Sequence, residues 1–379
     1  MKPDIRSQTK EELAACLKSW GEPAFRVSQV LGWLYGHWVA DWDAMTNLPQ
    51  PLREKLQAEF SLQAPELARK QGSRDRTQKF LWRLNDRSLI ESVLIPASPA
   101  LYGEASDRHT LCVSTQVGCA YGCKFCASGL AGWKRNLRAD EIVGQVIAVE
   151  RWHQGEMRRV KAEGRAEENS HLALPTSRLI NNLVIMGMGE PLANYDHLVK
   201  ALRILNAPWG GGIGARKITV STSGLAPQIR RLADEPLPVR LAVSLHGATD
   251  ETRNRIMPVN RKHPLRELIA ACEYYRRKKG RMITVEYVLI AGVNDGRDAA
   301  KALAALARRL RAKVNLIPCN KVEGLPWEHP DEKIQEQFLA ALERQKVVAT
   351  LRREKGHDID AACGQLRLKT ERELGGNPC

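Results

Sequence analysis

Residues 117–129 of the chain read VGCAYGCKFCASG, and this stretch brings Cys119, Cys123 and Cys126 within eight positions. Its glycines allow the backbone to wrap closely around a bound group. A structural zinc site almost always has four protein ligands, and the sequence contains no second C-x-x-C or H-x-x-x-H pair to complete one. A four-iron cluster suits three thiolates better, because one iron can stay open for a small molecule. The stretch therefore predicts an iron–sulfur site in a loop.

Six short apolar runs with strand character, the first of them just before this loop, are each followed by a helical pattern. They are TLCVSTQ at 110–116, NNLVIMG at 181–187, KITVSTS at 217–223, VRLAVSLH at 239–246, MITVEYVLI at 282–290 and AKVNLIP at 312–318. This alternation predicts an α/β fold with a parallel sheet and crossover helices. Six units favour a partial (β/α)6 barrel over residues 109–345, while a full eight-unit barrel or an open doubly wound sheet stays possible.

Three further regions surround this core. Residues 1–70 show helical spacing and predict a small helical N-terminal domain. Residues 71–108 contain two β-rich runs around Asn85-Asp86-Arg87 and predict a β-hairpin extension. The tail at 346–379 no longer shows strand-helix repetition, and the polar insertion at 153–178 predicts a lengthened helix end followed by an exposed loop.

Composition limits the class of protein. The chain has 379 residues with a formal net charge of +15, spread over most of its length, and this favours a polyanionic partner such as nucleic acid. It contains no apolar run of 18 residues and starts without a secretory signal, so we expect a cytoplasmic protein with no membrane contact. Nine cysteines in such a chain indicate reduced thiols for metal binding or catalysis.

Polar residues end several of the predicted strands, on the barrel face where chemistry is expected. They lie in MGMGEP at 186–191, STSG at 221–224, SLHG at 244–247 and IPCN at 317–320. Their carboxylate, hydroxyl, imidazole and amide groups suit the ammonium, carboxylate, ribose and adenine of a nucleoside cofactor. We expect cofactor contacts from Gly189, Glu190, Ser221, Ser244, Leu245, His246 and Asn320.

The spacing C-x3-C-x2-C, with Phe125 before the last cysteine and a strand before the loop, resembles the radical S-adenosylmethionine superfamily. The resemblance implies that Cys119, Cys123 and Cys126 bind one [4Fe–4S] cluster. The amino and carboxylate groups of S-adenosylmethionine would chelate its open iron, and an electron from the cluster would cleave the sulfonium to a 5′-deoxyadenosyl radical.

Within that superfamily the chain resembles, over nearly its whole length, the RlmN family of RNA adenine methyltransferases. The matching stretches include FRVSQVLGWLYGH at 25–37, TLCVSTQVGC at 110–119, VIMGMGEPLANYD at 184–196, SLHGATDETRNRIMPVNRKHPL at 244–265 and DIDAACGQL at 358–366. The insertion at 153–178 departs from the family pattern and lies away from every motif.

The resemblance implies a route to carbon 2 of adenine, an electrophilic carbon that an ordinary methyl donor does not attack. Cys363 would take a methyl group from one S-adenosylmethionine, and the radical from a second would activate that methyl for addition to the base. Glu91 would accept a proton, and Cys112 would release the covalent adduct by forming a transient disulfide with Cys363.

The implied substrates are an adenine of 23S rRNA and the adenine next to the anticodon in tRNAs, and we expect the helical N-terminal domain at 1–70 to recognise the RNA. A flavodoxin- or thioredoxin-like reductant is also implied. We expect a monomer. Two alternatives stay open at this point: a relative that methylates carbon 8 of the same adenine and confers antibiotic resistance, and a non-catalytic RNA-binding protein stabilised by zinc.

Overall fold

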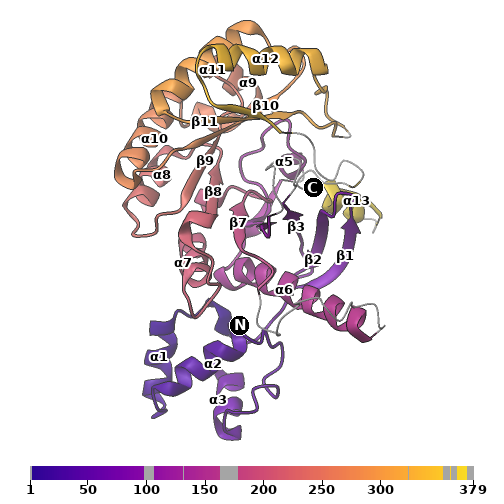
Figure 1. Ribbon diagram of the computed structural model, residues 1–379. Coiled ribbons are helices and arrows are strands. Elements are labelled where there is room, and N and C mark those ends of the chain that lie inside the picture. Colours follow the sequence, from indigo (N-terminus) through magenta and orange to yellow (C-terminus); the bar gives the residue numbers. More distant parts are fainter. Residues whose placement is uncertain are drawn as a thin grey trace.

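The computed structural model describes residues 2–97, 106–130, 132–162, 178–322, 324–352, 359 and 365–373. Its centre is a ten-stranded sheet with the order β1-β2-β3-β4-β7-β8-β9-β10-β11-β12 (Figure 1). The barrel strands are β4 (His109–Cys112), β7 (Asn182–Ile185), β8 (Ile218–Thr222), β9 (Arg240–Ser244), β10 (Thr284–Leu289), β11 (Lys313–Pro318) and β12 (Ala349–Leu351). Each pairs in parallel with the next along the chain.

The barrel is open, because β4 and β12 lie at opposite ends of this parallel series and do not pair within the described ranges. The six predicted runs are all strands in the predicted order, so the partial barrel is confirmed. The seventh parallel strand, β12, was missed because it has only three residues and lies in a tail that shows no repetition.

Helices cover the outer surface of the barrel (Figure 1). They are α6 (Ala139–Ala162), α7 (Tyr195–Asn206), α8 (Ala226–Asp234), α9 (Asp250–Ile256), α10 (Leu265–Lys279), α11 (Arg297–Leu310) and α12 (Glu332–Arg344). In α7, Leu198, Leu202 and Leu205 recur at helical spacing and are buried, which gives the helix one apolar face against the sheet. The lengthened helix predicted before residue 178 is α6, and the loop predicted after it lies outside the described residues.

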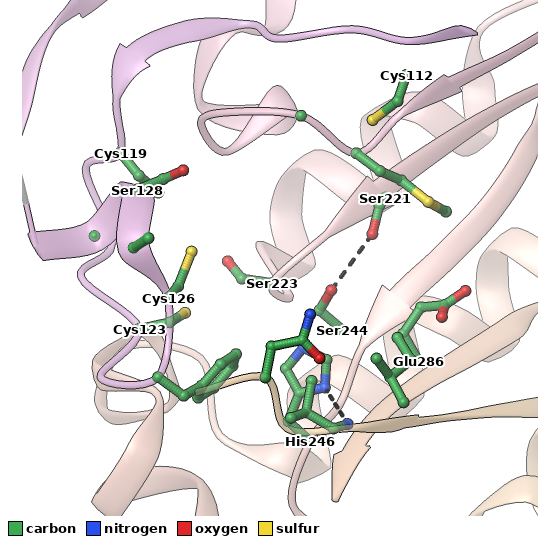
Figure 2. A pocket seen from close by; sticks show the side chains of 18 of the residues that line it. Cys112, Cys119, Cys123, Cys126, Ser128, Ser221, Ser223, Ser244, His246 and Glu286 are labelled. Atoms are coloured by element: carbon green, nitrogen blue, oxygen red, sulfur yellow. Dashed lines mark hydrogen bonds between the residues drawn. The ribbon is translucent and has the colours of Figure 1, made fainter. Parts of the chain in front are cut away.

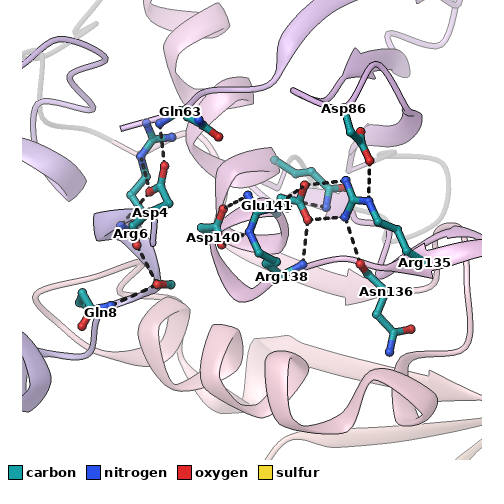
Figure 3. A network of polar contacts seen from close by, with 12 residues as sticks. Asp4, Arg6, Gln8, Gln63, Asp86, Arg135, Asn136, Arg138, Asp140 and Glu141 are labelled. Carbon is teal, nitrogen blue, oxygen red and sulfur yellow. Dashed lines mark hydrogen bonds and ion pairs between the residues drawn. The ribbon is translucent and has the colours of Figure 1, made fainter. Parts of the chain in front are cut away.

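The N-terminal helical unit consists of α1 (Lys10–Ser19), α2 (Phe25–Tyr35) and α3 (Gln50–Glu59). A capping box between Thr9 and Glu12 starts α1. A short 3-10 helix, η1 (Ile5–Ser7), contacts α6, and the Tyr35 hydroxyl donates to the carbonyl of Arg6 at 3.0 Å. Figure 3 shows this junction, where the Asp4 carboxylate accepts from the backbone N–H groups of Arg6 and Gln63 at 2.9 and 2.6 Å.

An antiparallel extension widens the sheet on the side of β4. It comprises β1 (Glu66–Gly72), β2 (Gln78–Arg83) and β3 (Leu89–Pro96), and β3 pairs with β4 so that Val93 lies opposite Cys112. The predicted hairpin is confirmed, but β1 begins inside the range predicted to be helical. Its residues are mostly charged or polar and half exposed, so the sequence carries little strand signal there.

The hairpin is tied to the barrel through Arg135. This residue lies on β6 (Trp133–Asn136), which pairs with β5 (Gln116–Gly118) in a separate two-stranded sheet. Its guanidinium binds Asp86 in the hairpin turn at 2.6 Å and Glu141 at the start of α6 at 2.8 Å (Figure 3). The turn of the extension is therefore fixed beside the loop that carries the three cysteines.

The tail returns to this extension as α13 (Gln365–Glu373), shown next to β1–β3 in Figure 1. Leu366 packs with Leu81 and Leu89, and Leu368 packs with Ala127 of α5 (Ala127–Leu130). The described parts of the tail therefore lie at two places on the sheet: β12 is its last strand, and α13 packs on the extension at its other end.

None of the helices described is long and apolar enough to cross a lipid bilayer.

Candidate active site

A cavity of about 590 Å³ lies where the parallel strands end, and it brings together residues that are far apart in the sequence. Figure 2 shows Cys123 and Cys126 on one side of it and Ser221, Ser244 and His246 on the other. The predicted site residues that line it are Cys112, Cys119, Cys123, Cys126, Gly189, Glu190, Ser221, Ser244, His246 and Asn320. A barrel should collect its chemistry on this face.

The cysteine loop is shaped by a glycine that no other residue could replace without strain. Gly118 has φ +80°, and a Cβ added there would lie 1.9 Å from the carbonyl oxygen of Gly132. The backbone N–H of Cys119 donates to the same oxygen at 2.9 Å. The β5–β6 pairing therefore fixes the position of Cys119 and the direction in which the loop enters the cavity.

The three thiols are suited to a cluster of several irons. Burial raises the pKa of the Cys119 thiol to about 12 and lifts that of Cys123 well above its usual value, so the thiolates need a bound cation. No group of three or more Cys, His, Asp or Glu side chains in the described part of the chain converges tightly enough to hold a single metal ion. A [4Fe–4S] cluster does not require such convergence, because each thiolate binds a different iron.

Glu190 is held rigidly at the end of β7. Its carboxylate accepts from the backbone N–H and the hydroxyl of Ser223 at 2.6 and 2.7 Å, and from the backbone N–H of Leu192 at 3.0 Å. Gly189 before it has φ +101°, and a Cβ there would lie 2.5 Å from the Cβ of Gln116. Burial raises the pKa of the Glu190 carboxyl, while these donors oppose that rise. A ligand ammonium at this carboxylate would favour its charged form.

His246 is a neutral hydrogen-bond donor. Its Nδ1 accepts from the backbone N–H of Val288 at 3.0 Å, so the ring proton must lie on Nε2. Burial, assisted by the charge of Arg253, lowers the pKa of the imidazole to about 3. Phe125, between the cysteines, meets the ring edge-on with 5.0 Å between centroids. Nearby, the hydroxyl oxygens of Ser221 and Ser244 lie 3.4 Å apart.

Arg253 supports the cavity wall from behind, and the sequence did not reveal this role. Its guanidinium donates to the carbonyls of Ser223 at 3.0 Å and Ser244 at 3.2 Å, and also to that of Leu245. It thereby ties together the ends of β8 and β9. The side chain is fully buried, although α9 reads as a polar helix in DETRNRI, so no local pattern distinguishes this arginine from its exposed neighbour Arg255.

Of two further residues predicted to contact the cofactor, one lines the cavity and the other does not. Asn320 lines the cavity, and its side-chain oxygen has no hydrogen-bond partner in the described part of the structure. Leu245 is absent from the cavity lining, because its side chain packs into the hydrophobic core. Its backbone N–H donates to the carbonyl of Glu286 at 3.0 Å, so this residue supports the wall rather than lining it.

Glu91 lies beside the cavity, under the tail helix. It is 3% exposed, so its side chain does not face solvent. Its carboxylate pairs with the buried Lys79 ammonium at 3.0 Å and accepts from the backbone N–H of Arg367 at 2.7 Å. Cys363 lies outside the described residues, while Ile359 and Gln365 on either side of it in the sequence both line the cavity.

Comparison with known proteins gives two family matches. Residues 4–62 match the ribosomal RNA large subunit methyltransferase N-terminal domain, and residues 176–304 match the radical SAM superfamily. The chain is 54% identical to the probable dual-specificity RNA methyltransferase RlmN 3 of Opitutus terrae, over 98% of this chain and 96% of the relative. It is 50% identical to the probable dual-specificity RNA methyltransferase RlmN of Akkermansia muciniphila, over 99% and 98%.

A solved structure agrees with these matches. The crystal structure of a radical SAM methyltransferase from Sphaerobacter thermophilus superposes with a TM-score of 0.82 at 42% sequence identity, covering 96% of this chain and 98% of that one. The agreement covers nearly the whole chain. It is thus not limited to the barrel that many unrelated activities share.

Proposed function

The chain belongs to the RlmN family of dual-specificity RNA methyltransferases, and we propose that it methylates carbon 2 of an adenine in 23S rRNA and of the adenine next to the anticodon in tRNAs. The observation that carries the proposal is the shared cavity, where the cysteine loop, the polar strand ends, Cys112 and the residues flanking Cys363 meet. The extended match of the N-terminal domain favours carbon 2 over the carbon-8 alternative.

Cys119, Cys123 and Cys126 would hold a [4Fe–4S] cluster, and Glu190 would accept from the ammonium of S-adenosylmethionine. The ring of Ser221, Ser244, His246 and Asn320 would take its remaining polar groups. When bound, the cluster and S-adenosylmethionine supply a radical that can remove a hydrogen atom from an otherwise unreactive methyl group. The chain's own residues then determine which methyl group and which base react.

Cys363 is the residue that carries the methyl group. Its thiolate takes the group from one molecule of S-adenosylmethionine, and a second molecule is consumed in the same turnover. After losing one hydrogen atom, the S-methyl carbon of Cys363 bonds to carbon 2 of adenine, which joins protein and RNA covalently. A flanking residue on each side of Cys363 lines the cavity, which supports its access to a base held there.

Release of the product requires a base and a second thiol. Glu91 accepts the proton that leaves carbon 2, and to reach it the carboxylate must give up the backbone N–H of Arg367. The adduct still carries one unpaired electron, which would pass to a one-electron acceptor, a role open to the oxidised cluster. Cys112 then attacks the sulfur of Cys363, so that the carbon–sulfur bond breaks with its electron pair on the carbon, a disulfide forms and the new methyl group takes a proton. A flavodoxin-like donor would reduce the cluster and a thioredoxin-like dithiol would reduce the disulfide. The chain would act as a monomer.

The RNA must present its target adenine unpaired, since extruding a paired base costs a few kcal/mol. The positive charge of the whole chain favours binding of such a polyanion. Basic stretches at 276–281 and 307–313 are candidates for phosphate contact. Part of their charge is already used, because Lys278 and Arg309 pair with Asp234 and Glu273.

The experiment is anaerobic reconstitution with iron and sulfide, followed by incubation with S-adenosylmethionine and an unmodified 23S rRNA fragment. Mass spectrometry of the digested nucleosides should find 2-methyladenosine, and the Cys363→Ala variant should give none. 8-methyladenosine would move the protein to the carbon-8 relatives. A colourless preparation with about one zinc and no methylated product would support the non-catalytic alternative.

A further inference from the structure

A buried carboxylate that none of the roles above uses lies in the cavity wall. Glu286 is the third residue of β10, lines the cavity and is only 5% exposed. One carboxylate oxygen, Oε1, accepts from the side-chain amide of Asn315 at 3.0 Å. The other, Oε2, has no hydrogen-bond partner within the described ranges. A buried carboxylate oxygen without a donor is costly, so its retention in a cavity points to a ligand group.

The strand register places Glu286 in a row of polar side chains. It lies opposite Ser244 on β9 and opposite Asn315 on β11. Residues opposite each other on paired strands point to the same face, here the inside of the barrel. Ser244 is itself one of the residues expected to contact S-adenosylmethionine, and it precedes His246 by two residues. The row therefore lies one level below His246 and adjoins the expected cofactor contacts in the same cavity.

Arg352 supplies the complementary charge. It directly follows β12 and also lines the cavity. Burial raises the pKa of the Glu286 carboxyl, and the positive charge of Arg352 opposes that rise. The two groups therefore interact electrostatically. Arg352 does not donate to Oε2 of Glu286, which has no hydrogen-bond partner in the described part of the chain. One wall of the cavity thus offers a ligand both a hydrogen-bond acceptor, the Glu286 carboxylate, and donors, the Arg352 guanidinium, which are not bonded to each other.

An adenine edge has the matching pattern. Its exocyclic amino group is a donor, and a ring nitrogen beside it is an acceptor. A carboxylate accepts from the first and a guanidinium donates to the second. Guanine carries an acceptor oxygen where adenine has the amino group, so a carboxylate would repel it. The same wall would therefore also discriminate between purines.

We propose that Glu286 and Arg352 recognise the edge of an adenine bound in the cavity. The inference rests on the proposed function, in which two ligands carry an adenine: S-adenosylmethionine and the target nucleotide of the RNA. Both present the same edge, and the test below separates them. Glu286 and Arg352 are specificity-determining residues in this account, and neither takes part in the transfer of the methyl group.

The test measures binding of analogue pairs to the reconstituted full-length protein, without turnover. The first pair is S-adenosylhomocysteine and its analogue with purine in place of adenine. The second is an RNA fragment with adenosine or with purine riboside at the target position. The wild-type protein should prefer the amino compound by roughly tenfold in at least one pair, which is the effect expected for a lost hydrogen bond to a charged group. The pair that shows the preference identifies the source of the adenine.

In Glu286→Gln, which keeps the size of the side chain, that preference should fall below about threefold. An unchanged preference in the variant, or none in the wild type for either pair, would overturn the proposal. Thermal unfolding shows whether the variant folds. If it does not, the exposed Arg352→Gln decides, measured with a third pair in which adenine is compared with a deaza analogue that has carbon in place of N1 or N7. The wild-type protein and the control Arg344→Gln on α12 should prefer adenine over this analogue, and Arg352→Gln should lose that preference. An unaltered preference in Arg352→Gln would then count against the inference.

Failure of this inference and failure of the proposed function give different results. Absence of any methylated adenosine from the wild-type protein would contradict the function. Normal methylation together with unchanged analogue ratios would contradict only the role of Glu286 and Arg352.

Discussion

His246 lies where a titrating group would be expected, yet its surroundings keep it neutral. The backbone N–H of Val288 occupies Nδ1, and burial holds the pKa of the imidazole near 3. A ligand oxygen in the cavity would therefore meet one fixed N–H donor, whatever the pH in the working range. Arg253 acts in a similar way on the backbone, since it fixes three carbonyl groups at the strand ends.

This arrangement predicts a pH effect on stability with a definite sign. The folded-state pKa of His246 lies near 3 and the unfolded value near 6.5, so the unfolded state binds the proton more readily between them. The free energy of unfolding should therefore fall as the pH drops from 6.5 towards 3. Denaturant unfolding at several pH values in this range gives the free energy of unfolding as a function of pH. The slope of this free energy against pH should be smaller in His246→Gln than in wild type, and the exposed His197→Gln should match wild type. An identical slope in all three proteins would contradict the burial argument.

At the scale of elements, the cysteine loop depends on the β5–β6 pairing. Gly118 and Gly122 both have positive φ, but only a Cβ at Gly118 would collide, at 1.9 Å from the oxygen of Gly132. A Cβ at Gly122 would meet nothing within 4 Å. The two glycines therefore share a conformational demand and differ in close approach, which makes them a matched pair.

Gly118→Ala should displace the start of the loop and lose most of the iron after reconstitution, whereas Gly122→Ala should pay only the cost of its φ, about 1 kcal/mol, and keep most of it. Iron analysis and the visible absorption of the reconstituted proteins measure this. Equal iron content in the two variants would show that the β5–β6 pairing does not set the loop.

The tail helix α13 is the second element on which the account depends. Glu91 holds its first turn through the backbone N–H of Arg367, and the fully buried Leu366 packs against Leu81 and Leu89. The helix begins two residues after Cys363 in the sequence. Its attachment to the extension should therefore govern how often Cys363 reaches the base.

Leu366→Ala should weaken this attachment by about 2–5 kcal/mol, the usual effect of truncating a buried leucine. Amide hydrogen exchange in 365–373 should accelerate and product formation should fall, while the iron content stays that of wild type. Lys369→Ala, on the exposed side of the same helix, is the control. Faster exchange without any loss of product would separate the helix from the reaction.

For the molecule as a whole, local sequence patterns predicted much of the architecture. The spacing of three cysteines and six alternating runs predicted the barrel and the face that holds the cavity, because ligand spacing and strand periodicity are properties of short stretches. β12 and β1 were missed, since a three-residue strand and a polar edge strand have weak periodicity. Arg253 and Glu286 were missed for another reason. Their burial depends on contacts between elements that are distant in the sequence.

The central claim is that the transferred carbon passes through a methyl group on Cys363. The most direct measurement uses methyl-deuterated S-adenosylmethionine with unmodified 23S rRNA fragment, and mass spectrometry of the digested nucleosides. We expect 2-methyladenosine that retains two of the three deuterium atoms, since one is removed before the carbon bonds to adenine and is replaced from solvent. Retention of all three would mean direct transfer of an intact methyl group, and would contradict the proposed roles of Cys363, Glu91 and Cys112.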